Sequence, residues 1–379
     1  MDFKLSNLHE SIRKSAQDFA EKIVEPLAAE TDRTHKFPMQ LFKQMTDQGF
    51  VGLTFPEAYG GSGLDDIAKV LVVEEIAKRD ASAAGTLSVT QVGPYCILHY
   101  GTEEQKKKFL PPVLSGGELA AFALTEPNAG SDAGAAKTKA IADGNDYIIN
   151  GTKCFITGGA LAKHVVVFAL TEPDKGIKGM SAIVVERGTP GFKAGKIEEK
   201  MGLCGSETAE LIFEDCRVPK ANLLGQEGKG FGIAMAALDA ARIGVAAQSL
   251  GIAERALEES VKYMKERIQF GKPIGMQQGL SWYVAEMKVR IEAARNLTLK
   301  AAWGKSAGVS YGMDAAIAKL YASETAMFCA DRGLQIHGGY GYMKEYPMER
   351  LYRDAKLMGI YEGTSEIHKL VIARGVLGM

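Results

Sequence analysis

The spacing of apolar residues changes twice along the chain, and this change limits the possible folds more than any other feature. In domain 1–120, apolar side chains recur every three or four positions, the period of a helix with one buried face. In domain 121–228 the period is two, as in strands, and in domain 229–379 the helical period returns in long stretches. The sequence therefore predicts an α, then β, then α layout. The clearest predicted helices are Phe3–Ile23, Ile67–Ile76, Phe231–Arg267, Gln277–Ser306 and Tyr311–Gln335.

Turn signals indicate how the middle segment is built. Its apolar runs are separated by turns instead of helices, which favours an antiparallel sheet or barrel over a doubly wound parallel sheet. The tripeptide Asp143-Gly144-Asn145 is a hairpin signal between two runs. In the first segment, Thr102 followed by Gln105 predicts a capping box at the start of a helix. The predicted strands include Tyr147–Ile149, His164–Leu170, Met180–Val185 and Ala209–Phe213.

The charge balance and the cysteines argue against several classes of protein. Lys and Arg total 45 and Asp and Glu 46, so the net charge of −1 gives no electrostatic case for nucleic acid or an anionic membrane. The five cysteines form no C-x-x-C pair, which argues against a disulfide framework and a zinc knuckle. The first residues carry charges early, and the apolar run Val165–Leu170 is too short to cross a bilayer. We expect a cytoplasmic protein that binds neither nucleic acid nor membrane.

Two common nucleotide-binding motifs are missing from the sequence. A nicotinamide dinucleotide fold should show G-x-G-x-x-G, but the densest glycine stretch has Ile233 in place of the last glycine. Gly304-Lys305-Ser306 ends like a P-loop, yet Leu299 stands where the first glycine is needed. The six histidines show no ligand spacing, so we assign them structural roles and expect no metal site.

Four short segments carry a more specific signal. They are LTEPNAGSD at 124–132, RIQFG at 267–271, QIHGGYG at 335–341, and RDAK at 353–356 leading to IYEGT at 360–364. Together, in this order and on an α–β–α layout, they resemble the acyl-CoA dehydrogenase family, and the resemblance covers essentially the whole chain. The overall likeness is closest to bacterial short-chain, butyryl-CoA-type members.

The resemblance implies a helical N-terminal domain, an antiparallel β-barrel middle domain and a C-terminal helical bundle, with FAD as cofactor. The implied reaction converts a short-chain acyl-CoA thioester to the trans-2-enoyl-CoA. A base must take the α proton and the flavin N5 the β hydride, because no side chain accepts hydride. Glu362 matches the family's catalytic glutamate, and a carboxylate is a suitable base if burial raises its pKa. Some relatives place the base at a position that is Ala241 here, so Glu362 has no rival.

Other positions match residues that contact the CoA thioester. Ser131 matches a residue beside the pantetheine–phosphate chain. Asp239 and Arg242 match residues along the CoA cleft, with Arg242 close enough to influence the base. These two residues are also spaced like a helix ion pair, and that simpler interpretation stays open. Tyr361 and Gly363 flank the base and belong to the same predicted substrate site.

The resemblance also implies that residues from two subunits hold the flavin. Near the isoalloxazine ring, main-chain amides and a threonine hydroxyl can donate hydrogen bonds, and Phe155 stands where many relatives carry Trp. Arg267 and Phe270 match residues that reach the adenosine pyrophosphate from a neighbouring subunit, as in a homotetramer built as a dimer of dimers. The predicted flavin-binding residues are Leu124, Thr125, Phe155, Thr157, Arg267, Phe270, Gln278, Gln335, Gly338, Gly339, Thr364 and Glu366.

Several functions remain open at this point. The leading one is dehydrogenation with electrons passed to electron-transfer flavoprotein. The same site can run in reverse as an enoyl-CoA reductase in an anaerobe, for example on an aryl-acrylyl-CoA, with an electron-bifurcating electron-transfer flavoprotein. A third hypothesis is an oxidase that passes the electrons to oxygen. A helical binding or scaffold protein that has lost catalysis is a fourth, from a different class.

Overall fold

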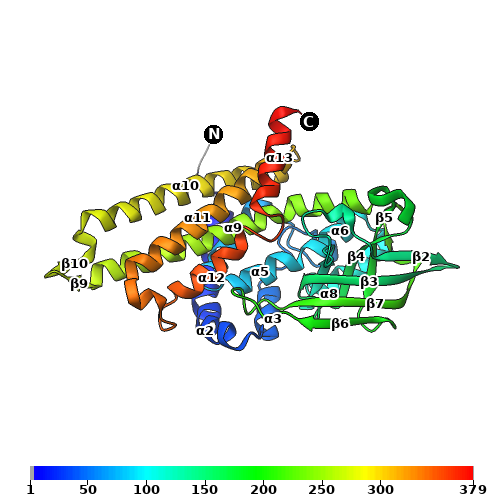
Figure 1. Ribbon diagram of the computed structural model, residues 1–379, viewed down its shortest axis with the longest axis horizontal. Helices are drawn as coiled ribbons and strands as arrows, with labels where there is room; N and C mark the ends of the chain where they lie inside the picture. The colour runs from blue at the N-terminus through cyan, green and yellow to red at the C-terminus, as the bar shows by residue number, and fades with distance from the viewer. Residues whose placement is uncertain (1–3, 379) are drawn as a thin grey trace.

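The computed structural model describes residues 4–378 and shows three segments in chain order (Figure 1). Helices fill the first segment, strands the middle one and long helices the last, which confirms the predicted α–β–α layout. The first helices end at Leu114 and the first strand begins at Ala120; the last strand of the sheet ends at Leu224 and the next helix begins at Gly230. Domain boundaries at 120 and 228 stay a prediction, because one buried core cluster contains residues of all three segments.

The N-terminal segment is a group of short helices, and its sequence signals explain where they begin. The Thr102 hydroxyl accepts the Gln105 amide at 3.3 Å while Gln105 Oε1 accepts the Thr102 amide at 2.8 Å, so the predicted capping box is confirmed. Phe3 lies outside the described residues. Within them, the predicted helix 3–23 begins only at Asn7, after the cap Ser6, and continues through α1 into a π-helical turn at Ala20–Val24. The helices are α1 (Asn7–Phe19), α2 (Glu25–Thr34), α3 (Met39–Asp47), α4 (Asp66–Ala77), α5 (Ala81–Thr90), α6 (Val92–Tyr100), α7 (Glu103–Phe109) and α8 (Pro111–Leu114).

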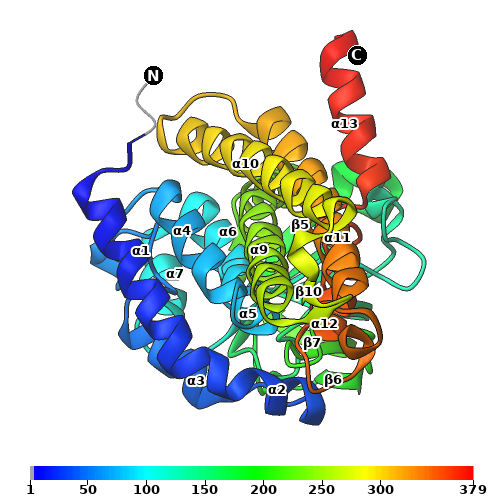
Figure 2. The same cartoon turned by 90° about the vertical axis from the view of Figure 1, so that its left-hand side faces the viewer.

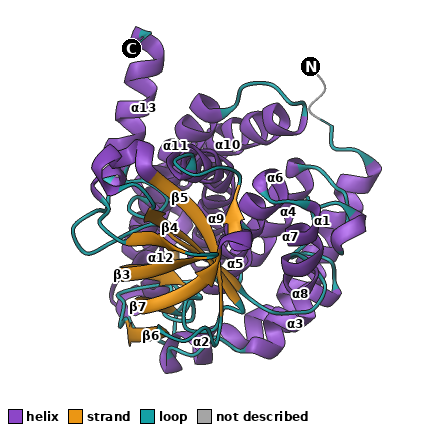
Figure 3. Cartoon of the chain, turned by 90° about the vertical axis from the view of Figure 1, so that its right-hand side faces the viewer, coloured by secondary structure: helices purple, strands orange, loops and turns teal. Residues whose placement is uncertain are grey.

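The middle segment forms one sheet beside the N-terminal helices (Figure 3). Its strands follow the order β6-β7-β3-β2-β4-β5-β8, with β1 also paired to β4. Most pairs are antiparallel, and the turn Gly144-Asn145 joins β2 to β3 as predicted. The strands are β1 (Ala120–Ala123), β2 (Lys139–Asp143), β3 (Asp146–Thr157), β4 (His164–Leu170), β5 (Met180–Glu186), β6 (Phe192–Ile197), β7 (Thr208–Pro219) and β8 (Leu223–Leu224).

The sheet departs from the predicted antiparallel barrel in two ways. β1 and β2 both pair parallel to β4, because long connections separate these strands in the sequence and bring them back in the same direction. Within residues 4–378, the outer strands β6 and β8 do not pair with each other, so no closed barrel forms. The period of two along a strand shows which faces are buried, but it shows neither the direction of the partner strand nor closure.

Helix α9 (Gly230–Glu266) is the central element of the C-terminal segment. In Figure 2 it is seen end-on, with α4 and α6 on one side, α10 above and α11 on the other. By length and composition it could cross a membrane, but 67% of its most apolar window is buried in the fold, as expected of a core helix. The other elements are β9 (Ile268–Gln269), β10 (Lys272–Pro273), α10 (Gln278–Ser306), α11 (Gly312–His337), α12 (Met348–Met358) and α13 (Ser365–Leu377).

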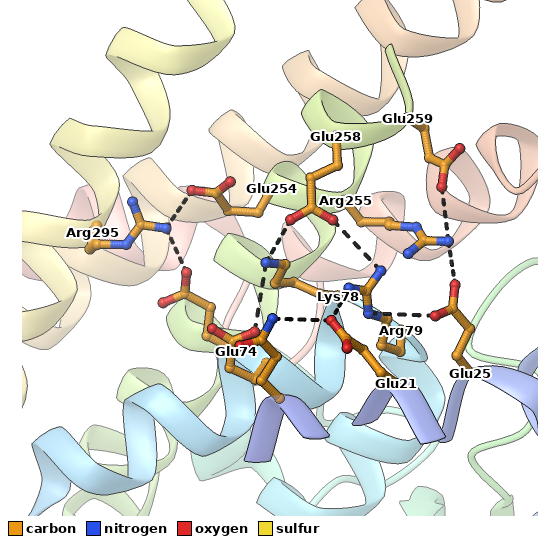
Figure 4. Close-up of polar contacts among 12 residues, drawn as sticks. Glu21, Glu25, Glu74, Lys78, Arg79, Glu254, Arg255, Glu258, Glu259 and Arg295 are labelled. Carbon is orange, nitrogen blue, oxygen red and sulfur yellow. Dashed lines mark hydrogen bonds and ion pairs between the residues drawn. The ribbon is translucent and has the colours of Figure 1, made fainter. Parts of the chain in front are cut away.

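A network of ion pairs fixes α9 and α10 to the N-terminal helices (Figure 4). Arg295 of α10 donates to Glu74 of α4 and to Glu254 of α9, both at 2.6 Å. Lys78, directly after α4, pairs with Glu258 of α9 at 2.6 Å. Because these charges are shared among several partners, the network holds the helices more firmly than isolated surface pairs would. It therefore sets the position of α4 against α9, on which the site described below depends.

Large apolar side chains are exposed at the end of α9 that lies away from the sheet. The short hairpin β9–β10 forms this end of the molecule, and α13 projects from the body elsewhere (Figures 1 and 2). Phe270 in the hairpin is 94% exposed. Trp282, near the start of the next helix, is 60% exposed. Such exposed apolar surface is typical of contact with another protein.

Candidate active site

Glu362 lies in the loop between α12 and α13, in a backbone conformation that few side chains adopt. Its φ is +52°, and that of Gly363 is +95°, so two successive left-handed residues turn the chain sharply. Thr364 then caps α13 through its hydroxyl, which accepts the Ile367 amide at 3.4 Å. A non-glycine residue held in this region is often part of a functional site, because the surrounding structure must enforce the conformation.

The Glu362 carboxylate is close to two cations but bonded to neither. Its Oε2 atom is buried and has no hydrogen-bond partner in residues 4–378. Burial raises the pKa of Glu362 above its ordinary value of 4.5, and the positive charges of Lys319 and Arg242 oppose the rise without cancelling it. A carboxylate that has one buried, unpartnered oxygen and a raised pKa is suited to take a proton from a ligand beside it.

Lys319 and His368, which the sequence did not single out, complete the surroundings of Glu362. Lys319 on α11 is fully buried and donates to the Gly363 carbonyl at 2.6 Å. Burial lowers its pKa to about 8, although the charge of Glu362 raises it. Burial, with the charges of Lys319 and Arg242, lowers the pKa of His368 to about 3, so this histidine is neutral. It lies in the core, but neither ring nitrogen has a partner in residues 4–378.

Helix α9 supplies the other predicted substrate residues. Arg242 donates to the Asp239 carboxylate, so the helix ion pair that the spacing allowed is present. Arg242 also acts on the pKa of Glu362, which agrees with its predicted closeness to the base, while its position along a CoA cleft stays a prediction. Its Nε atom is buried without a partner, as Oε2 of the glutamate is. The Tyr361 hydroxyl donates to Gln248 Oε1, farther along α9, and this bond holds the loop of Glu362 against the helix.

A second group of predicted residues lies where β1 meets β3. Leu124 is buried, and its carbonyl accepts from Lys153 Nζ at 2.9 Å. Lys153 is fully buried and also pairs with Glu126 Oε1 at 2.7 Å. The Thr125 carbonyl accepts the amide of Cys154 at 3.0 Å. The buried pair Lys153–Glu126 thus fixes the segment that carries Leu124 and Thr125.

A bulge in β3 directs Phe155 away from the core. The register between β3 and β7 shifts between Lys153 and Ile156, and Phe155 has a φ of +57°. Phe155 is consequently 65% exposed, whereas Lys153, two positions earlier, is buried. Thr157 ends the strand and is half-buried, and Ser131 lies exposed in the loop after β1. The bulge leaves an aromatic ring free to contact a ligand.

The third group lies at the opposite end of α9 from the sheet. Leu124 shares a buried cluster with Ala241, whereas Arg267 comes 26 residues later, about 40 Å along a helix. Gly338 and Gly339 follow α11 beside Arg267, whose guanidinium lies 5.4 Å from the ring of Tyr340. The members of this group are Arg267, Phe270, Gln278, Gln335, Gly338 and Gly339. Within one chain, the second and third groups therefore lie far apart. The remaining predicted flavin-binding residues, Thr364 and Glu366, lie close to Glu362 in the sequence, at the start of α13.

Comparison with known proteins finds, across the whole chain, the same family that the sequence motifs resemble. Family models described as acyl-CoA dehydrogenase N-terminal, middle and C-terminal domains match residues 6–117, 121–216 and 228–377. An acryloyl-CoA reductase (NADH) of Anaerotignum propionicum is 59% identical over 100% of this chain and 96% of its own length.

Solved structures agree closely with the fold. Butyryl-CoA dehydrogenase of Megasphaera elsdenii superposes with a TM-score of 0.98 at 48% identity and covers 100% of both chains. A chain from a structural study of the electron transferring flavoprotein of Acidaminococcus fermentans and flavin-based electron bifurcation gives a TM-score of 0.98 at 50% identity, again over 100% of both.

Proposed function

Because the chain belongs to the acyl-CoA dehydrogenase family, we propose that it interconverts a short-chain acyl-CoA and its trans-2-enoyl-CoA, with Glu362 as the base. The observation that carries this proposal is the Glu362 carboxylate beside Lys319 and Arg242, with its Oε2 atom buried and unpartnered and its pKa raised. The chain is an oxidoreductase of an FAD-dependent family. We also propose a cytoplasmic location, since the relative with 59% identity is bacterial.

The residues present fit FAD. Gly338 has a φ of +57° and a ψ of −137°, which only glycine adopts readily, and an added Cβ there would meet nothing within 4 Å. Gly339 is equally open, so the backbone offers a surface for the close approach of phosphate oxygens. Arg267 forms no ion pair within residues 4–378 and is free to bond a phosphate. The exposed ring of Phe155 offers an aromatic face at the other group.

Several side chains contribute to removal of the α proton, each in a different way. Bound FAD supplies the hydride-accepting half of the reaction. Glu362 takes the proton from the α carbon, and burial stabilises the neutral carboxyl group that results. The charges of Lys319 and Arg242 oppose the rise in pKa and so favour the ionised form that the next turnover needs. The bonds from Lys319 to the Gly363 carbonyl and from Tyr361 to Gln248 keep the carboxylate in place.

The acid side of the pH profile reports the pKa of Glu362. Only the ionised carboxylate takes a proton, so the rate of flavin reduction should rise with pH through a pKa above 4.5. Lys319→Met removes a charge that lowers this pKa, so the acid limb should move to higher pH. The measurement is single-turnover flavin reduction between pH 5 and 9, with exposed Lys369→Met as the control. An unmoved limb in a Lys319→Met protein with normal FAD content would contradict the assignment.

We propose that the protein is a homotetramer in which the third group of one subunit completes the FAD site of another. The distance along α9 and the exposed Phe270 and Trp282 support this arrangement. Arg267→Ala should then weaken FAD binding by roughly 10- to 100-fold, the usual cost of a lost hydrogen bond to a charged group. FAD titration of apoprotein measures the effect, and Arg217→Ala on the sheet is the control. Unchanged affinity, or full FAD binding by isolated monomers, would refute the shared site.

The chemistry proposed above can run in either direction, so the physiological direction of the reaction is a separate question. Electron-transfer flavoprotein is the proposed partner, since a similar chain occurs in the structural study of that protein. The 59% identity to an acryloyl-CoA reductase favours reduction as a second candidate. The test compares butyryl-CoA plus oxidised electron-transfer flavoprotein with crotonyl- and acryloyl-CoA plus the reduced partner. A higher kcat/KM with butyryl-CoA supports the dehydrogenase, and a higher value with either enoyl-CoA supports the reductase. Peroxide formed in air at the turnover rate would instead identify an oxidase.

A further inference from the structure

A third buried lysine, besides Lys319 and Lys153, lies on α4 and is not used by the proposed reaction. Lys69 is 7% exposed and has neither a hydrogen bond nor an ion pair in residues 4–378. The nearby carboxylate of Asp66 is already bound through both oxygens by Lys305, at 2.8 Å each. Burial and the charge of Lys305 lower the pKa of Lys69 to about 8, so the ammonium form still predominates at neutral pH. A buried ammonium without a partner is costly, and an anion beside it would remove much of that cost.

Gln91, which lines the same cavity as Lys69, carries further polar atoms without a hydrogen-bond partner. It is 3% exposed, and both its Oε1 and its Nε2 are buried without a partner in residues 4–378. Gln91 and Lys69 line one cavity of about 20 Å³, which suits a small polar group better than an extended chain. An ammonium and an amide NH₂ are both donors, so an acceptor with two oxygens would satisfy both.

The cavity lies beside the proposed active site. Its wall includes Ala240 and Ala241 of α9, which directly precede Arg242. Lys69 Cε would lie 3.8 Å from a Cβ built on Gly244, two residues after Arg242. On the other side, Ala241 belongs to the same buried cluster as Leu124. The cavity therefore borders the part of α9 that carries Arg242, and it shares Ala241 with the buried cluster of Leu124.

The charges around the cavity favour an anion. Lys69 and Lys305 carry two positive charges against the single negative charge of Asp66, which leaves one positive charge uncompensated. A methyl end would leave Lys69 and the Gln91 amide unsatisfied, and a neutral acceptor would leave the charge unbalanced. Only an anionic group satisfies these two donors and also balances the positive charge.

We propose that Lys69 and Gln91 form the far end of the acyl-binding site and select short acyl-CoA or enoyl-CoA thioesters whose acyl group ends in a carboxylate. This inference rests on the proposed function and names the substrate class of the same site. Lys69 and Gln91 are specificity residues in this account, and Glu362 keeps its role as the base.

The test compares pairs of thioesters that differ only at the far end. Succinyl-CoA is matched with butyryl-CoA and glutaryl-CoA with valeryl-CoA, in each case a carboxylate against a methyl group. For at least one pair, wild-type protein should show a kcat/KM about tenfold or more higher for the carboxylate. Lys69→Met, which keeps the length of the side chain without its charge, should reverse this preference and spare the methyl substrate. Gln91→Leu should reduce the preference less, and exposed Lys196→Met should not change it.

The outcomes separate this inference from the function on which it rests. If no thioester reduces the flavin, the proposed function fails. If wild-type protein reduces its flavin with butyryl- and valeryl-CoA but prefers them to their carboxylate partners, the substrate class alone is refuted. A Lys69→Met protein with normal FAD content that loses activity equally on both members of a pair would show a purely structural lysine, and it too would overturn the inference.

Discussion

Glu362→Gln should slow flavin reduction by butyryl-CoA by roughly 10²- to 10⁴-fold, the range expected when a general base is removed. The amide has nearly the same size and keeps the loop between α12 and α13, but it cannot take a proton from the α carbon. Because Oε2 has no partner in residues 4–378, the substitution breaks no hydrogen bond of that atom in the protein. FAD content and acyl-CoA binding should therefore stay close to wild type. Anaerobic stopped-flow absorbance of the flavin measures the rate.

A matched control lies four residues away in the same region. Glu366 is exposed in the first turn of α13, and the Thr364 hydroxyl and its own backbone amide lower its pKa, its amide contributing most. Glu366→Gln removes the same charge from nearly the same place. Because Glu366 is also a predicted flavin-binding residue, both rates are taken per bound FAD, and proton removal by the Glu366→Gln protein should then be intact. Equal losses in both variants would indicate a general electrostatic effect and would argue against Glu362 as the base.

Lys153→Met should lower the free energy of unfolding by about 3 to 5 kcal/mol, because it leaves a buried carboxylate without its cation. Burial alone would raise the pKa of Glu126, but the charge of Lys153 and the Lys137 amide lower it below its ordinary value. The Lys137 and Thr138 amides, at 2.7 and 3.0 Å, remain as donors and place the loss toward the lower end of the range. The Leu124 carbonyl also loses its donor, so FAD should bind more weakly. Urea unfolding followed by circular dichroism measures the stability.

Two further variants separate the buried charge from simple packing. Lys193→Met breaks an exposed pair with Glu214 on the same sheet and should change stability little. Lys153→Met combined with Glu126→Gln removes both charges and should recover part of the loss, since the unpaired carboxylate is gone. A double variant less stable than Lys153→Met alone would show that the pair is not the source of the effect.

Much of the fold could be predicted, because the helical and strand periods are strong over long stretches. The run His164–Leu170 forms β4 with the same bounds, and the predicted helix 277–306 forms α10 within one residue at its start. The parallel pairs of β4 could not be predicted, since they depend on contacts between distant segments. The bulge at Phe155 was also hidden, because a single extra residue in a strand leaves no periodic signal.

The candidate site could likewise be predicted only in part. Glu362 could be identified only through the motif around it, since an isolated Glu-Gly reads as a loop. Lys319 did leave a signal, because it falls on the same helical face as the buried Ala315 and Ala322. Lys69 left none, since α4 is buried nearly all round and the period does not show which side faces a cavity. Their roles depend on charge and burial, which the three-dimensional structure supplies.

The most direct test of the account is an anaerobic titration of the purified protein with acyl-CoA, followed by flavin absorbance. Substrates deuterated at the α carbon are included alongside the ordinary ones. We expect the purified protein to be yellow, an acyl-CoA of the tested series to bleach the flavin, and α-deuteration to slow the bleaching, because Glu362 removes that hydrogen as a proton. A protein that binds FAD but is bleached by no acyl-CoA would not be an acyl-CoA oxidoreductase. A protein bleached at a rate that α-deuteration does not change would contradict removal of the α proton by Glu362.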